Sequence, residues 1–183
     1  MLFKIRPFFL QLLFFSTIAW LSLHALKVAA VEVPDWHRLQ ISAPAGLLQQ
    51  VRKDYVSDVN PEQPVDIGQM QLLQISKPKA KSLYIVNTRL PGLDPSSNPS
   101  CGQAGCLFYG YIQQGNRFVQ VLNGYINDFR LQGSPPVIQL LNQIANQLPC
   151  LQLTFYQNQS QRLMRSKLCF DGKEYQPVQT STK

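Results

Sequence analysis

Four cysteines, Cys101, Cys106, Cys150 and Cys169, are the most chemically versatile side chains in this chain. An even number of cysteines predicts a disulfide framework if the chain is exported. Zinc sites normally use two closely spaced cysteine pairs, whereas Cys150 and Cys169 are far apart in sequence. The C-x-x-C spacing of redox-active pairs is absent as well. We therefore expect two structural disulfides and no bound metal or cofactor.

The sequence around Cys150 and Cys169 predicts that they pair with each other. If Gln159 and Ser160 form the turn of a hairpin, opposed residues have numbers that add to 319, and Cys150 then faces Cys169. Opposed side chains lie close enough for a disulfide. This register also pairs apolar with apolar and polar with polar residues, as a half-buried strand pair requires: Leu151 with Leu168, Phe155 with Met164, Gln152 with Lys167, and Thr154 with Arg165. By elimination, Cys101 pairs with Cys106.

Acid–base side chains are few beyond the first thirty residues. His37 is the only histidine there, and no G-x-S-x-G motif accompanies it, which favours a partly exposed histidine over a catalytic one. Asp54 and Asp58 lie one helical step apart, a pattern more typical of a solvated helix surface than of two facing catalytic carboxylates. The alternative is a hydrolase of envelope polymers that uses carboxylates from the set Asp54, Asp58, Asp94 and Asp128.

Two groups of side chains are candidates for binding. In the hairpin register above, Arg165 and Lys167 share one face with Gln152 and Thr154, and this positive strip could hold an anionic polymer or form an ordinary solvated sheet face.

Tyr109 and Tyr111 form the second group. They point away from Phe108 because strand side chains alternate. They could be exposed near the loop of residues 89–105, or they could pack in the core. This loop is rich in Pro, Gly, Ser, Asp and Asn, and loops of its length are often functional.

The N-terminal segment predicts export. Lys4 and Arg6 precede a run from Phe8 to Leu26 without charged residues, as in a secretory signal. As a helix this run would be roughly 28 Å long, close to the thickness of a bilayer, so an uncleaved membrane anchor is the alternative. We expect residues 1–30 to be a signal peptide or membrane anchor, and residues 31–183 to be a single exported, disulfide-stabilised domain.

The charge balance gives little support to nucleic-acid binding. The chain has 17 basic and 10 acidic residues, a net charge of +7. Lys4, Arg6 and Lys27 belong to the N-terminal segment, which leaves 14 basic residues against 10 acidic ones in the remainder. For a weakly basic exported domain we expect an envelope protein or an anionic polymer as the partner, and we do not expect a nucleic acid.

Apolar spacing and turn signals predict the elements that position these residues. A helix is expected over residues 45–57, and strands over residues 70–75 and 83–86. Residues 107–113, 118–122 and 125–131 read as three strands, joined by turns at Gly115-Asn116 and Asn123-Gly124.

A second helix is expected after Pro135 and Pro136, with apolar residues at helical spacing at Val137, Leu140, Leu141, Ile144 and Leu148. The expected fold class is α+β. It has one antiparallel meander sheet and two short amphipathic helices, preceded by an N-terminal hydrophobic signal or anchor helix.

These features predict a non-enzymatic exported or envelope module that binds an unknown protein or an anionic polymer. A more specific version is an inhibitor-like protein that docks through the loop of residues 89–105. The carboxylate-dependent hydrolase and a single-pass assembly subunit, anchored in the membrane from Phe8 to Leu26, are the alternatives.

Overall fold

The structure, a computed structural model, describes residues 35–77, 80–126, 137–157 and 162–178. These residues belong to one compact unit, Pro34–Lys183. The expected signal or anchor segment and the turn at Gln159 and Ser160 lie outside the described residues. Within the described ranges, the structure contains no helix with the length and hydropathy needed to span a membrane.

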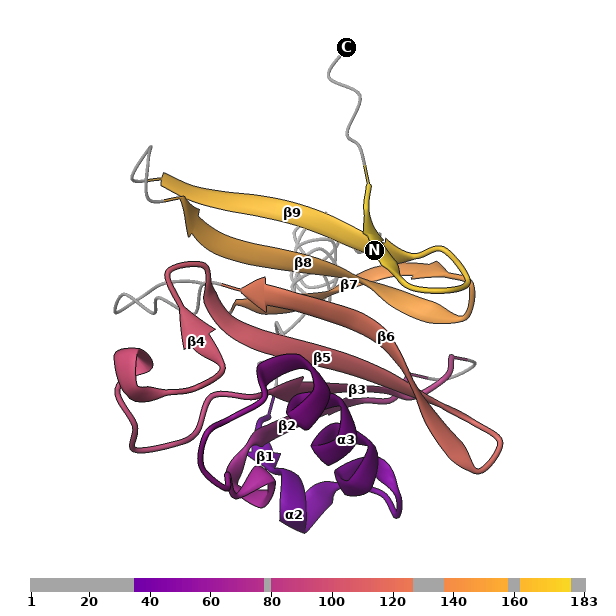
Figure 1. The fold of residues 1–183 in the computed structure, drawn as a ribbon. Coiled ribbons are helices and arrows are strands. Elements are labelled where there is room, and N and C mark those ends of the chain that lie inside the picture. The colour runs from indigo at the N-terminus through magenta and orange to yellow at the C-terminus, as the bar shows by residue number, and fades with distance from the viewer. Residues whose placement is uncertain (1–34, 78–79, 127–136, 158–161, 179–183) are drawn as a thin grey trace, which may run out of the picture. The chain divides into compact units, whose positions relative to one another are not determined.

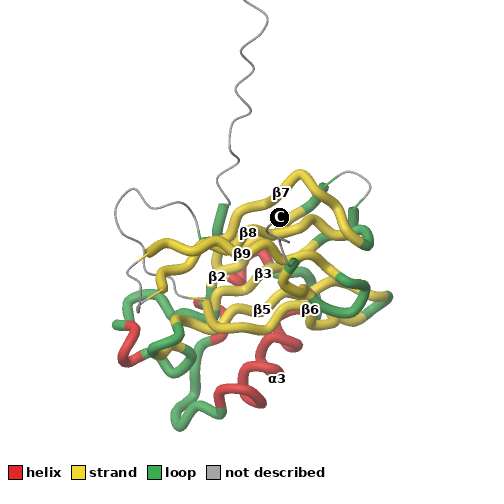
Figure 2. Tube along the Cα trace, turned by 90° about the horizontal axis from the view of Figure 1, so that it is seen from above, coloured by secondary structure: helices red, strands yellow, loops and turns green. Residues whose placement is uncertain are grey.

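Strands dominate the unit, and the expected α+β class is confirmed, with few helices (Figure 2). The expectation of one sheet is wrong, because the strands form two antiparallel sheets. The first sheet contains β1 (His37–Arg38), β2 (Gln71–Ile75), β3 (Leu83–Asn87), β4 (Cys101–Gly102), β5 (Gly105–Gln114) and β6 (Arg117–Ile126). The second contains β7 (Ile138–Ala145), β8 (Leu148–Gln157), β9 (Arg162–Phe170) and β10 (Tyr175–Pro177). The helices are α2 (Leu39–Ser42) and α3 (Leu47–Val59), with 3-10 turns η2 (Ile67–Gln69) and η3 (Pro95–Ser97).

The first sheet is the middle of three layers (Figure 1). One apolar core lies between the two sheets and includes Phe108 and Ile112 of β5 with Leu151 of β8. A second core lies between the first sheet and the helices, and includes Tyr109 of β5 with Tyr55 of α3. Because both faces of β5 are covered, its sequence is almost continuously apolar, unlike that of a half-exposed strand.

The second predicted helix is wrong. Residues 138–145 form β7, and Leu148 begins β8. Asn146 (φ 47°) and Gln147 (φ 69°) make the tight turn between them, since two consecutive positive φ values are the signature of a type I′ hairpin turn. The register of β7 shifts between Leu140 and Ile144, so its apolar residues do not alternate regularly along the sequence. Their spacing therefore resembles that of a helix.

The prediction of a turn at Asn123-Gly124 is also wrong. Both residues lie inside β6, where Asn123 pairs with Tyr109 and Gly124 with Phe108. The chain has already reversed at Gly115 (φ 61°), the turn predicted at Gly115-Asn116, and β6 then pairs with β5 as far as Ile126, with one register shift between Gly110 and Tyr111. Tyr125 therefore continues β6, while residues 127–131 of the expected third strand lie outside the described residues.

The hairpin of β8 and β9 has the predicted register. Leu151 pairs with Leu168, Gln152 with Lys167, Thr154 with Arg165 and Phe155 with Met164. Disulfides join Cys150 to Cys169, with their Cα atoms 4.4 Å apart, and Cys101 to Cys106. Both predicted pairings are thus present, and two disulfides fit an oxidising environment. Thr154, expected on a solvated face, is instead only 4% exposed.

Candidate binding site

Helix α3 covers the face of the first sheet that carries Tyr109 and Tyr111. Leu47, Val51 and Tyr55 recur every four residues and face the sheet, as predicted for this helix. The helix ends at Asn60, whose left-handed backbone (φ 46°) lets its N–H donate to the carbonyl of Val56 at 3.1 Å. Residues 60–66 form the segment that follows the C-terminal end of α3.

Tyr109 and Tyr111 are fully buried beneath α3, so of the two alternatives they follow core packing and are not exposed near the loop of residues 89–105. The hydroxyl of Tyr111 donates to Asp54 Oδ2 at 3.0 Å, and that of Tyr109 donates to Asp58 Oδ2 at 3.1 Å. Burial raises the pKa of both tyrosines above its usual value, and the neighbouring carboxylates add to the shift. Asp54 and Asp58 therefore bind the helix to the sheet and do more than solvate a helix surface.

The Tyr111→Phe variant is expected to lower the free energy of unfolding by about 1.5 kcal/mol at pH 7, because Asp54 loses a charge-assisted hydrogen bond. An unfolded tyrosine loses its proton near pH 10, whereas buried Tyr111 retains it. Raising the pH above about 10 therefore destabilises the wild type by up to about 1.4 kcal/mol per unit through this residue, and phenylalanine lacks this effect. The difference in the free energy of unfolding between the wild type and Tyr111→Phe should therefore become smaller above pH 10.

Urea denaturation at pH 7 and at pH 10.5 measures this gap. Tyr125→Phe is the matched control, because Tyr125 is 55% exposed and its loss should leave stability at pH 7 unchanged. A gap for Tyr111→Phe that stays constant over this pH range would contradict the assigned burial and hydrogen bond.

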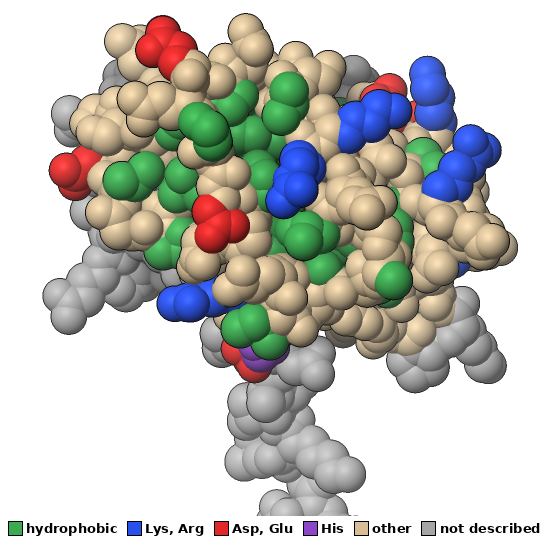
Figure 3. Space-filling view, turned by 60° about the horizontal axis from the view of Figure 1, so that its bottom comes forward, with side chains coloured by type: hydrophobic (Ala, Val, Ile, Leu, Met, Phe, Trp, Pro, Cys, Tyr) green, Lys and Arg blue, Asp and Glu red, His purple; other side chains and the backbone are tan. Residues whose placement is uncertain are grey.

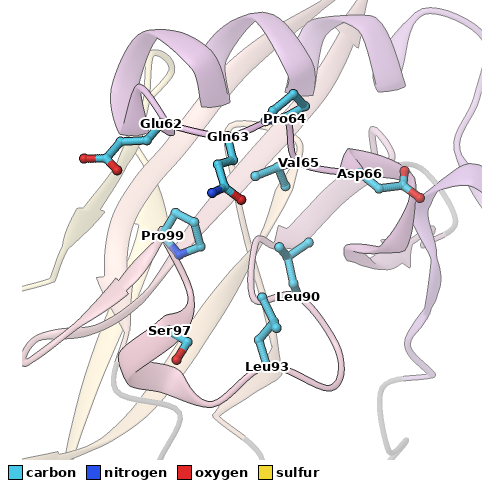
Figure 4. Close-up of a pocket in the computed structure, with 9 residues that line it drawn as sticks. All are labelled: Glu62, Gln63, Pro64, Val65, Asp66, Leu90, Leu93, Ser97 and Pro99. Carbon is cyan, nitrogen blue, oxygen red and sulfur yellow. The ribbon is translucent and has the colours of Figure 1, made fainter.

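A surface hollow of about 550 Å³ lies between residues 60–66 and the loop that follows β3. Figure 4 shows Val65 facing Leu90 and Leu93, with the Gln63 amide pointing between Pro99 and these apolar side chains. Glu62 and Asp66 lie towards opposite ends, and their carboxylates point away from the centre. The hollow thus has an apolar wall with acidic groups at its rim.

A buried polar network holds the loop that forms this hollow. The Thr88 hydroxyl donates to the carbonyl of Leu107 at 2.8 Å, and the Asn98 amide donates to the carbonyl of Leu90. The Ser100 hydroxyl lies 3.1 Å from the Thr88 carbonyl and 3.0 Å from Asn98 Oδ1. All three of Thr88, Asn98 and Ser100 are buried. Together with the Cys101–Cys106 disulfide, these bonds hold the two ends of the irregular segment together.

A second hollow of about 510 Å³ adjoins the first, on the α3 side of residues 60–66. Its lining includes Arg52, Tyr55 and Val56 of α3, together with Pro61. The Tyr55 hydroxyl is buried near Ser100, but it forms no hydrogen bond of ordinary geometry with any of the described residues. The face on which α3 lies carries apolar side chains in separate clusters between acidic and basic groups (Figure 3).

The structure separates the residues that the sequence singled out. Arg165 and Lys167 lie on β9 in the second sheet, away from both hollows. His37 is exposed at the edge strand β1, with Nε2 3.2 Å from Asp35 Oδ2. Asp94 is exposed in the loop before η3, and Asp128 lies outside the described residues. No group of three or more potential metal ligands occurs within the described ranges.

The sequence identified one side of the hollow and missed the other. The loop of residues 89–105 was singled out, and it supplies Leu90, Leu93, Ser97 and Pro99. Residues 60–66, which follow the helix expected over residues 45–57, carry no functional prediction from the sequence, although Pro61 and Pro64 indicate a stiff segment. Comparisons with models of protein families, with curated proteins and with solved structures give no match.

Proposed function

We propose that the chain is an exported, non-enzymatic module that binds a protein partner in the hollow between residues 60–66 and the loop after β3. The observation that supports this most is an apolar surface hollow whose irregular wall is held by buried hydrogen bonds and a disulfide. A wall held in one conformation before binding loses little conformational entropy when a partner docks. Export through residues 1–30 is part of the proposal, and the two disulfides support it.

The lining indicates the chemistry of the partner. Val65, Leu90 and Leu93 offer apolar contact, whereas Glu62 and Asp66 place negative charge at the ends of the hollow. The complementary ligand is an apolar side chain with lysine or arginine nearby in the partner's sequence. A hydrolase that uses Asp54 and Asp58 has less support, because buried tyrosine hydroxyls donate to these carboxylates.

Panning a displayed peptide library against the full chain tests the proposal. We expect enrichment of peptides with an apolar residue flanked by basic residues. The Leu93→Asp variant should weaken their binding by at least tenfold, because it places a charge on the apolar wall. Leu93 is 41% exposed, so the fold should tolerate the change.

Ile144→Asp is the matched control, since Ile144 is 46% exposed on β7, outside both hollows. Glu62→Gln should weaken the same peptides less than Leu93→Asp does, and mostly at low salt. Failure to enrich any peptide, or equal binding by the Leu93→Asp and Ile144→Asp proteins, would refute the hollow as the binding site.

A further inference from the structure

Charge is distributed unevenly between the two sides of the first sheet. Strands β7, β8 and β9 carry no acidic side chain, and their basic side chains, Arg162, Arg165 and Lys167, all lie on β9. By contrast, Asp54, Asp58, Glu62 and Asp66, four of the 10 acidic residues in the chain, lie within 13 residues of one another at α3 and the segment after it. The strands β7, β8 and β9 are therefore purely cationic, and the acidic residues nearest to them in the sequence, Asp171 and Glu174, lie with Lys173 in the turn between β9 and β10, at the opposite end of β9 from Arg162.

The start of β9 is exposed on both of its faces. Residues 162–165 are four consecutive exposed residues in a strand, where successive side chains point to opposite faces. Figure 1 shows β8 and β9 running side by side to this end of the sheet. Two of the four side chains are large and apolar, since Leu163 is 47% exposed and Met164 is 41% exposed. Arg162 and Arg165 flank them directly.

We propose that this end of the hairpin, residues 162–165 together with Lys167, binds the surface of an anionic membrane. Guanidinium groups form paired hydrogen bonds with phosphate oxygens, so Arg162 and Arg165 engage the lipid headgroups. Leu163 and Met164 then enter the boundary between headgroups and acyl chains. A soluble polyanion would occupy only the basic side chains and leave both apolar ones in water, and this difference favours a lipid surface. The inference does not depend on the hollow.

Sedimentation of the full chain with vesicles tests the electrostatic part. The ratio of binding to phosphatidylcholine vesicles with and without phosphatidylglycerol isolates charge selectivity, because the apolar N-terminal segment is common to both measurements. Arg162→Gln with Arg165→Gln should reduce this ratio by roughly 25-fold, about fivefold for each arginine. Arg38→Gln with Arg117→Gln removes two exposed arginines from the first sheet and should change the ratio far less.

Methyl NMR tests the insertion of Met164. The chain has three methionines, Met1, Met70 and Met164, so methyl labelling gives few signals. Met70 is fully buried in the helix-side core and is the internal control. With spin-labelled lipid in the anionic vesicles, the Met164 methyl signal should broaden strongly, and the Met70 signal should remain sharp.

Each contrary result has a distinct meaning. Equal losses of charge selectivity in the two arginine pairs would show that net charge alone attracts the protein, and would overturn the site. Loss in the β9 pair without broadening of Met164 would show that the arginines bind the headgroups while Met164 stays in water, and would overturn the insertion that distinguishes a membrane from a soluble polyanion. Because all four arginines are exposed, unchanged thermal unfolding should confirm that the variants fold.

Discussion

Replacing Cys150 and Cys169 together with alanine is expected to lower the free energy of unfolding by about 3 kcal/mol. The bridge joins residues separated by 19 positions, and the chain-entropy model relates the stabilisation by a disulfide to the length of the loop it closes. Cys150 is fully buried, and alanine leaves no unpaired polar group in its place. Urea denaturation of the oxidised wild type and of the double variant at neutral pH measures the difference.

Cys101→Ala with Cys106→Ala is the matched comparison. This bridge spans only 5 positions, so the same model gives a smaller loss of about 2 kcal/mol. The pair also anchors the loop that lines the hollow, and its removal should weaken peptide binding more than removal of the Cys150–Cys169 bridge does. A larger loss of stability from the short bridge than from the long one would be inconsistent with an entropic origin.

The register of the last hairpin could be predicted because three local constraints agree. Turn position, alternation of apolar residues and the need to pair Cys150 with Cys169 all select the same opposed residues. Helix α3 was predictable for a similar reason, since its apolar residues recur on one face and Asn60-Pro61 ends the pattern. Local sequence is sufficient where each of its signals indicates the same structure.

The errors arise where long-range pairing decides between local alternatives. Asn123-Gly124 is a favoured turn sequence, but β5 pairs with β6 on both sides of a single bulge and continues as its partner through Asn123 and Gly124 to Ile126. Asn146-Gln147 contains no glycine, and its side-chain amide at Asn146 donates to the carbonyl of Phe170 at 2.9 Å, a partner 24 residues away. No local pattern reveals such a bond.

The hollow could be predicted only on one side for the same reason. Residues 60–66 and the loop after β3 meet because α3 folds back over the sheet, and the burial of Tyr109 and Tyr111 has the same cause. A strand that is apolar on both faces, such as β5, is the signal in the sequence that a layer covers each side. The apolar sequence of β5 does not reveal which segment of the chain covers each face.

The Phe108→Ala variant is expected to lower the free energy of unfolding by about 3–5 kcal/mol, as is typical when a buried phenylalanine is truncated. Phe108 is 1% exposed in the core between the two sheets, and its ring meets that of Trp36 edge-on, with centroids 6.3 Å apart. Its opposed residues on the neighbouring strands are Asn87 and Gly124, so no large apolar side chain lies directly across from it to fill the cavity.

Tyr125→Ala tests whether this loss comes from the core. Tyr125 is the neighbour of Gly124 on β6 and is 55% exposed, so its truncation should change stability by less than about 0.5 kcal/mol. Both variants are measured by urea denaturation, with the slope of the transition as a check on two-state unfolding. A loss below about 1 kcal/mol for Phe108→Ala would mean that the sheets do not pack on this ring, since relaxation seldom removes most of the cost of such a cavity. If only Phe108→Ala lowers the free energy of unfolding strongly, the packing of the second sheet depends on a side chain of β5. The same strand carries Tyr109 and Tyr111 on its other face, so β5 contributes side chains to both cores.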